Sequence, residues 1–287
     1  MKINPKPLVF YFAVVSCVSI FIVLGMGSIL SAPNNVEIGE IPSELNGKEV
    51  KFKNKFGNIL SGWFVPGDDN HGGILLMHGV HSNRIQMIQR AIFLNKSGYS
   101  VFLFDFQAHG ESEGEKITFG YLEAYDAEAA YTYLINHIKK KSVGVIGVSL
   151  GGASALLGDV AKKSNALVIE SVYPTFTEAV QNRMYMRFGN IGYYLSALLI
   201  WQIEPRLGFN PDILKPINML SNLNTPVFII AGTDDEHTTL SESKRMYDQA
   251  SKPKKIWLIK GAKHQDFYRY SPLIYREKIL GFFDQYL

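Results

Sequence analysis

Six short apolar runs, separated by longer segments with helical patterning, constrain the fold of this chain most strongly. Near-continuous apolar strands that alternate with helices are typical of a parallel sheet covered on both faces. The runs occupy residues 73–77, 100–104, 143–146, 166–169, 227–231 and 256–259. Helices are expected at residues 84–95, 121–138, 150–162, 240–250 and 272–286. We therefore predict an α/β fold with a mostly parallel central sheet and helices on both faces.

Two regions depart from this alternation. Residues 49–53 and 59–65 flank Phe56-Gly57-Asn58, which predicts an antiparallel hairpin before the first apolar run. Residues 172–223 lie between two predicted strands and are far longer than an ordinary connection. They are rich in Tyr, Phe, Met and Leu, so we expect a helical cap insertion whose apolar side chains line a pocket or fasten the cap to the body.

One pentapeptide, Gly147-Val148-Ser149-Leu150-Gly151, follows the apolar run 143–146 directly. A Gly-x-Ser-x-Gly sequence between a strand and a helix is typical of a nucleophile elbow, in which a sharp turn lifts the serine hydroxyl above the sheet. The turn requires neighbours without bulky side chains, and the two glycines meet that requirement. Ser149 is therefore the candidate nucleophile.

A serine hydroxyl is a weak nucleophile and needs a histidine base, which a carboxylate orients. An elbow serine is followed along the chain by the acid and then by the histidine. His264 lies just past the last predicted strand and before the terminal helix, where it can reach Ser149. The remaining histidines precede Ser149 or lie close to the candidate acids: His71, His78, His81, His109, His137 and His237.

The candidate acid lies in Gly232-Thr233-Asp234-Asp235-Glu236, directly after the run 227–231. Adjacent aspartates point in different directions, so only one can orient the imidazole. We predict Asp235, with Asp234 in a turn or capping role. Glu170, at the end of the preceding strand, is a second possible acid.

An oxyanion hole requires two backbone N–H groups. One is expected from Leu150, directly after the nucleophile, and the other from Val80, in the turn that follows the run 73–77. His78 is expected to brace that turn rather than to take part in the chemistry.

Composition excludes several other classes of protein. The formal net charge of +3 is too small and too dispersed to indicate nucleic-acid binding. Cys17 is the only cysteine, which excludes a disulfide framework and a thiolate metal site. The sequence has no metal cluster, phosphate loop or dinucleotide fingerprint, so no cofactor is expected.

The N-terminal segment has no charged residue from 8 to 30, which is long enough for a transmembrane helix. Lys2 and Lys6 precede it, and acidic residues follow it, so the positive-inside rule predicts a cytoplasmic N-terminus and a periplasmic or extracellular globular domain. A cleaved signal peptide is the alternative, and Val14-Val15-Ser16-Cys17 resembles a lipoprotein box in an unfavourable position.

Three further motifs carry a family resemblance. Residues 76–84 are similar to the oxyanion loop of the α/β hydrolases, residues 105–114 to the family's Asp-x-Arg-Gly-His-Gly-x-Ser loop, and residues 261–266 to its terminal Gly-x-x-His. With the elbow, they resemble a bacterial, membrane-associated branch of serine aminopeptidase-like hydrolases. The chain departs from the pattern at Gln107-Ala108, which replaces Arg-Gly and removes a cation beside the site.

The resemblance implies an α/β-hydrolase fold over residues 48–287. The residue patterns place the cap at about 172–223 within it, and before it a linker at 33–47 and a membrane anchor at 1–32. It also implies a serine hydrolase, of the carboxylic ester hydrolase class (EC 3.1.1), that cleaves an ester, thioester or amide through an acyl-enzyme. The apolar cap and the expected membrane anchor favour a small-molecule or lipid-like substrate with an apolar acyl group. The alternatives are an aminopeptidase-like serine peptidase and a catalytically silent binding protein of the same fold.

Overall fold

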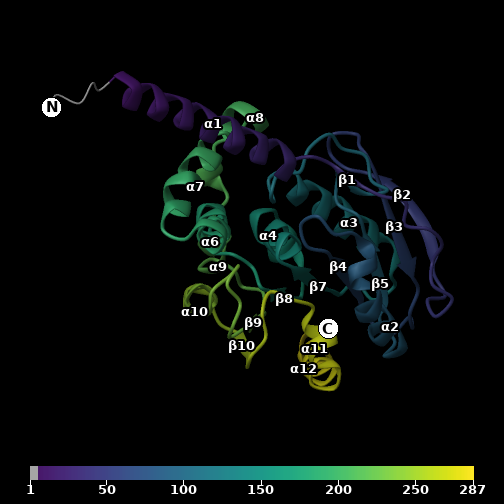
Figure 1. The fold of residues 1–287 in the computed structure, drawn as a ribbon. Helices are drawn as coiled ribbons and strands as arrows, with labels where there is room; N and C mark the ends of the chain where they lie inside the picture. Colours follow the sequence, from purple (N-terminus) through teal and green to yellow (C-terminus); the bar gives the residue numbers. More distant parts are fainter. Residues whose placement is uncertain (1–5) are drawn as a thin grey trace.

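An eight-stranded sheet forms the centre of the described chain (Figure 1). The computed structural model describes residues 6–287, without the side chains of residues 6–9, 12, 13, 15 and 16. The strand order is β10-β9-β8-β7-β4-β5-β3-β2, and only β3 runs against its neighbours. The strands are β2 (Lys48–Lys53), β3 (Ile59–Val65), β4 (Gly73–Met77), β5 (Ser100–Phe104), β7 (Val143–Val148), β8 (Ala166–Glu170), β9 (Val227–Gly232) and β10 (Lys254–Ile259).

Helices cover both faces of this sheet. On β4, Leu75 and Met77 join the core under one set of helices, and Ile74 and Leu76 join the core under the other. This alternation follows from the two-residue period of a strand. The first set comprises α3 (Glu123–His137), α4 (Leu150–Leu157), α5 (Val160–Lys163) and α10 (Leu240–Gln249). The second comprises α2 (Ile88–Lys96), α11 (Phe267–Tyr270) and α12 (Pro272–Tyr286), with the 3₁₀ turn η1 (Arg84–Met87) before α2.

The predicted α/β architecture, mostly parallel sheet and hairpin are confirmed. Each of the six apolar runs is a strand, and β2 pairs antiparallel with β3. The helix expected at 150–162 is divided into α4 and α5, because α4 ends at Gly158, whose backbone is extended. Similarly, the helix expected from residue 84 begins as the 3₁₀ turn η1.

The segment between β8 and β9 is largely helical. Thr175 caps its first helix by accepting a hydrogen bond from the backbone N–H of Glu178, and Gly189, with φ of 55°, ends that helix. The elements are α6 (Phe176–Phe188), α7 (Ile191–Trp201), α8 (Ile203–Leu207), η2 (Pro211–Ile213) and α9 (Ile217–Leu220). In Figure 1, α6 and α7 stand beside α4, at the edge of the sheet where the elbow lies.

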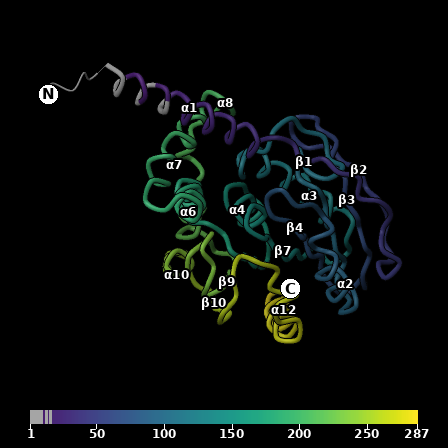
Figure 2. The backbone as a smooth tube through the Cα atoms, viewed as in Figure 1, coloured from purple at the N-terminus to yellow at the C-terminus, as the bar shows by residue number. Residues whose placement is uncertain are grey.

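The N-terminal helix α1 (Lys6–Leu30) lies along α7 and α8 (Figures 1 and 2). Val23 packs against Met184 and Leu199 of the cap. Two cap side chains bind the backbone of α1: Gln202 Nε2 donates to the Val23 carbonyl at 3.1 Å, and Arg206 Nη2 donates to the Leu24 carbonyl at 3.0 Å. The C-terminal half of α1 is thus joined to the cap.

The expected transmembrane helix is not supported. A search of the described residues finds no helix that is both long and apolar enough to span a membrane. Residues 1–5, which include Lys2 of the predicted cytoplasmic end, lie outside the described residues. The region expected to be a linker contains β1 (Asn34–Asn35), which pairs in parallel with β6 (His109–Gly110).

Candidate active site

Ser149 occupies the sharp turn between β7 and α4. Its φ of 48° and ψ of −106° lie outside the conformations that an L-residue ordinarily adopts. Close packing around the turn explains the two glycines: a Cβ atom on Gly151 would lie 2.5 Å from the Met77 carbonyl oxygen, and one on Gly147 would overlap Gly152. The strained backbone places a serine that is only 4% exposed on the wall of a cavity.

Asp235 lies in the loop after β9, buried at the base of the site. Its Oδ1 accepts hydrogen bonds from the backbone N–H groups of His237 (2.8 Å) and Thr238 (2.9 Å), and its Oδ2 accepts one from the Ser171 hydroxyl (3.0 Å). Burial alone would raise the pKa of the carboxyl, but the hydrogen bond and charge of His264 and these donors outweigh it and lower the pKa below its ordinary value.

His264, in the loop after β10, meets Asp235 directly. Its Nδ1 lies 2.8 Å from Asp235 Oδ2, which leaves Nε2 as the nitrogen available to a proton donor. The described contacts include no hydrogen bond between Ser149 Oγ and this imidazole; such bonds are often long in a site without substrate. The ring of His237, which lines the same cavity as Ser149, has its centroid 4.8 Å from that of His264.

The structure places the other candidate acids in different roles. Glu170 is fully buried in an ion pair with Arg90, at 2.8 Å, and also binds the Tyr275 hydroxyl. Asp234 is exposed, and its Oδ1 accepts a hydrogen bond from the Thr233 hydroxyl in the turn. Of the candidate acids, only Asp235 contacts the ring of His264 in the described contacts.

The two predicted oxyanion donors flank Ser149. Leu150 is the first residue of α4, so its N–H has no acceptor within the helix, and Val80 lines the cavity beside it. Among the described residues, the backbone N–H of Val80 donates to no other group. His78 accepts a hydrogen bond from the Phe106 N–H on Nε2, and its Nδ1 contacts the Gly79 carbonyl, so it braces this turn; burial is the main cause that lowers its pKa to about 3.

Comparison with known proteins agrees with this geometry. A family model described as "Serine aminopeptidase, S33" matches residues 68–172, which include the oxyanion turn and the elbow. The esterase Pf2001 of Pyrococcus furiosus superposes with a TM-score of 0.73 at 23% identity, and the match covers 90% of this chain and 98% of that one. This chain has the α/β-hydrolase fold, and its residues 68–172 are similar to a family of hydrolases with that fold.

Sequence relatives of this chain include two bacterial proteins without an assigned activity. Rv2307c of Mycobacterium tuberculosis is 27% identical over 236 residues, which cover 79% of this chain and 77% of that protein. YqkD of Bacillus subtilis is 23% identical over 233 residues, covering 80% and 76%. The lysophosphatidylserine lipase ABHD12 of Danio rerio is 27% identical over 218 residues, which cover 74% of this chain but only 55% of the lipase.

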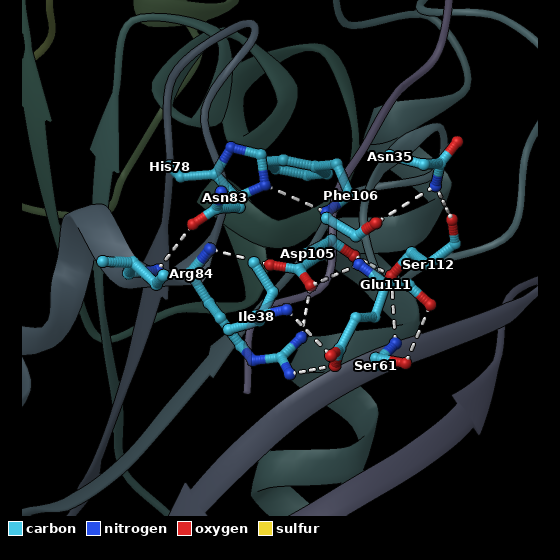
Figure 3. Close-up of polar contacts among 12 residues, drawn as sticks. Asn35, Ile38, Ser61, His78, Asn83, Arg84, Asp105, Phe106, Glu111 and Ser112 are labelled. Atoms are coloured by element: carbon cyan, nitrogen blue, oxygen red, sulfur yellow. Dashed lines mark hydrogen bonds and ion pairs between the residues drawn. The ribbon is translucent and has the colours of Figure 1, made fainter. Parts of the chain in front are cut away.

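A buried ion-pair network supports the loops beside the candidate site (Figure 3). Arg84, in the turn after β4, pairs with the fully buried Asp105 and with Glu111, and its backbone N–H donates to Asp105 Oδ1 at 2.7 Å. The Ser112 hydroxyl completes the network by donating to the Asp105 carbonyl at 2.6 Å. The loop from 105 to 114 therefore has a cation although Gln107-Ala108 replaces the family's Arg-Gly, because Arg84 supplies it from the neighbouring turn.

The cavity over Ser149 has a volume of about 450 Å³, within the usual range for small-molecule sites. The cap contributes Phe176, Val180 and Leu199, and α1 contributes Met26 and Leu30. The sequence does not predict the contribution of α1 to this cavity, because an apolar run that predicts a membrane helix also fits a pocket wall.

The charged part of the lining was also missed: Arg183 and Arg187 of α6 face the cavity. Their spacing of four residues on one predicted cap helix was a signal that could have been used. Within residues 6–287, no cluster of three or more His, Cys, Asp or Glu side chains could hold a metal ion.

Proposed function

We propose that this protein is a serine hydrolase that cleaves carboxylic esters or thioesters through an acyl-enzyme. The observation that carries the proposal is a strained, glycine-flanked Ser149 on the wall of a largely apolar cavity, with the hydrogen-bonded pair of His264 and Asp235 on the adjacent loops. In other proteins this combination activates a serine for acyl transfer.

In the first half of the reaction, Ser149 Oγ attacks the carbonyl carbon and transfers its proton to His264 Nε2. Asp235 holds Nδ1 and stabilises the imidazolium that forms. The N–H groups of Val80 and Leu150 stabilise the oxyanion of the tetrahedral intermediate. The intermediate collapses when the bond to the alcohol or thiol breaks, and the leaving group takes the proton from His264.

In the second half, a water molecule gives a proton to His264 and attacks the acyl-enzyme. The Ser149–acyl bond then breaks, Ser149 recovers the proton, and the acyl group leaves as a carboxylic acid. An acyl chain fits the apolar cap and α1 surfaces of the cavity. The similarity to a lysophosphatidylserine lipase and to an esterase supports ester substrates of this kind.

An aminopeptidase is the second candidate, favoured by the description of the matching family model. It requires an acidic group that binds the amino terminus of the substrate. Three acidic residues in or near the cap could be considered for this role, Glu170, Glu178 and Glu204, but none of them lines the cavity. Glu178 pairs with Arg245 at 2.7 Å, and Glu170 pairs with Arg90. Because the cavity presents arginines instead, its charge opposes a cationic substrate terminus.

Hydrolysis of p-nitrophenyl esters from acetate to palmitate, compared with aminoacyl-anilides, tests the proposal. The full chain is used because α1 forms part of the cavity, and Ser149→Ala is the blank. We expect Ser149-dependent ester turnover with a maximum at one chain length. Preferential turnover of the anilides would transfer the assignment to a peptidase, and the absence of both activities would favour a binding protein.

A further inference from the structure

Two arginines of the cap helix α6 share the cavity with the candidate nucleophile. Arg183 and Arg187 are four residues apart, so both project from the same side of α6, and both line the cavity that contains Ser149. Most of the surrounding wall is aliphatic or aromatic, as Phe176 and Leu199 illustrate. The positive charge is therefore concentrated in one part of an otherwise apolar site.

Neither arginine has a carboxylate partner among the described residues. The guanidinium of Arg183 donates one hydrogen bond, from Nη1 to the Ala179 carbonyl of its own helix at 2.9 Å. Its acidic neighbours already bind other groups: Asp235 binds His264, and Glu242 accepts hydrogen bonds from Asn182 at 2.8 Å. Four of the five N–H bonds of this guanidinium are left for a ligand or for water.

The energetics of this arrangement favour an anion. Arg183 is half-buried, and its pKa is lowered mainly by burial. The charges of Tyr173, Asp235 and Glu242 act in the opposite direction and raise the pKa. The guanidinium remains protonated at neutral pH. Desolvating a cation that has no carboxylate in direct contact is costly, and two like charges at i and i+4 of a helix repel each other. His237, which also lines the cavity, has its pKa lowered to about 4, chiefly by burial, and stays neutral.

We propose that Arg183, assisted by Arg187, binds an anionic group of the substrate, so that the preferred acyl ester carries a carboxylate or a phosphate. Both groups accept the paired N–H bonds of a guanidinium. The inference rests on the proposed hydrolase function and adds the charge of the substrate to it. The apolar wall then binds the acyl chain while the arginines bind the anion.

Two matched substrate pairs locate the anion. In the first pair, mono-p-nitrophenyl glutarate is compared with p-nitrophenyl pentanoate, so that the charge is a carboxylate on the acyl side. In the second, a 1-acylglycerol 3-phosphate is compared with the 1-acylglycerol of the same chain, so that the charge is a phosphate on the leaving side. We expect kcat/KM of the anionic member of at least one pair to be higher by about tenfold or more, through KM, and to decrease with added salt.

Variants of the full-length protein then test Arg183 itself. Arg183→Gln should lower the anionic-to-neutral ratio of kcat/KM by about tenfold to a hundredfold, and Arg183→Lys should recover part of it. The matched control is Arg269→Gln, which removes the same charge from an arginine that lies outside the cavity and has a 77% exposed side chain. This control should leave the ratio unchanged.

Two results would overturn the subsite. One is a wild-type protein that does not prefer the anionic member of either pair, and the other is an Arg183→Gln variant that slows both members of a pair equally. Labelling of the wild type with an uncharged fluorophosphonate separates this failure from that of the proposed function. If the protein is labelled at Ser149 but does not prefer anionic substrates, only the subsite proposal is rejected. If it is not labelled and turns over none of the four substrates, the subsite and the hydrolase function are both rejected.

Discussion

Replacement of Asp235 by asparagine should abolish most activity through the proton position on His264. Two backbone N–H groups, of His237 and Thr238, point at Oδ1 of residue 235. They fix the orientation of an amide, because only its oxygen can accept from them. In the Asp235→Asn variant, the side-chain NH₂ group then takes the place of Oδ2, which faces His264 Nδ1 at 2.8 Å. Nδ1 must become an acceptor, so the ring proton moves to Nε2, where it prevents proton transfer from Ser149.

The expected loss of kcat is about 10³- to 10⁴-fold, equivalent to about 4 to 5 kcal/mol of transition-state stabilisation. It is measured with the best p-nitrophenyl ester, and the thermal midpoint establishes that the variant folds. Asp234→Asn is the matched control: the side chain of Asp234 is exposed, and its one described hydrogen bond is from the Thr233 hydroxyl, so kcat of this variant should change less than about twofold. A folded Asp235→Asn variant with less than a tenfold loss, or an equal loss in the control, would refute this account.

Three further predictions concern the loops and the pocket. Arg84→Met leaves the buried Asp105 carboxylate without its ion-pair partner, which should reduce the free energy of unfolding, measured by urea titration, by about 3 kcal/mol or more. A reduction of less than about 1 kcal/mol would contradict the stabilising role of the Arg84–Asp105 ion pair. His78 has a folded-state pKa of about 3, below that of the unfolded chain, so the stability gained by burying the neutral imidazole is complete above about pH 6.5 and is lost as the pH falls. At about pH 4.5 the free energy of unfolding should be lower by roughly 3 kcal/mol. A urea midpoint that is constant between these two pH values, or that varies equally with pH in His78→Gln, would contradict this prediction. Leu30→Trp enlarges a side chain of α1 that lines the cavity, so it should shift the ester preference toward shorter acyl chains. We expect kcat/KM for the longest ester to fall roughly tenfold relative to the shortest. An unchanged chain-length profile would exclude α1 from the acyl site.

The sequence predicts the sheet well because buried parallel strands have a strong local signal. The run 73–77 coincides with β4, and the terminal helix predicted at 272–286 has the bounds of α12. The helix expected at 150–162 is less accurate, since Gly158 has an extended backbone there, which a periodic pattern does not reveal.

Contacts between distant segments are harder to predict. The cation that pairs with Asp105 comes from Arg84, twenty-one positions earlier, and nothing in the local pattern of either loop indicates this pair. The uncharged run at 8–30 leads to the prediction of a membrane helix, which the structure does not support, and Met26 and Leu30 of this run lie on the cavity wall. The sequence predicts Asp235 as the acid but leaves Glu170 as a second possibility. The contacts that distinguish these residues, the pairing of Glu170 with Arg90 and the exposure of Asp234, depend on the folded structure.

Intact mass spectrometry after treatment with an uncharged fluorophosphonate tests the central claim most directly. The full-length wild type should gain one phosphonyl group, located at Ser149 by peptide mapping, and pretreatment should abolish ester hydrolysis. Ser149→Ala, with an unchanged thermal midpoint, should gain none. An unlabelled wild type, or equal labelling and turnover in Ser149→Ala, would contradict the account.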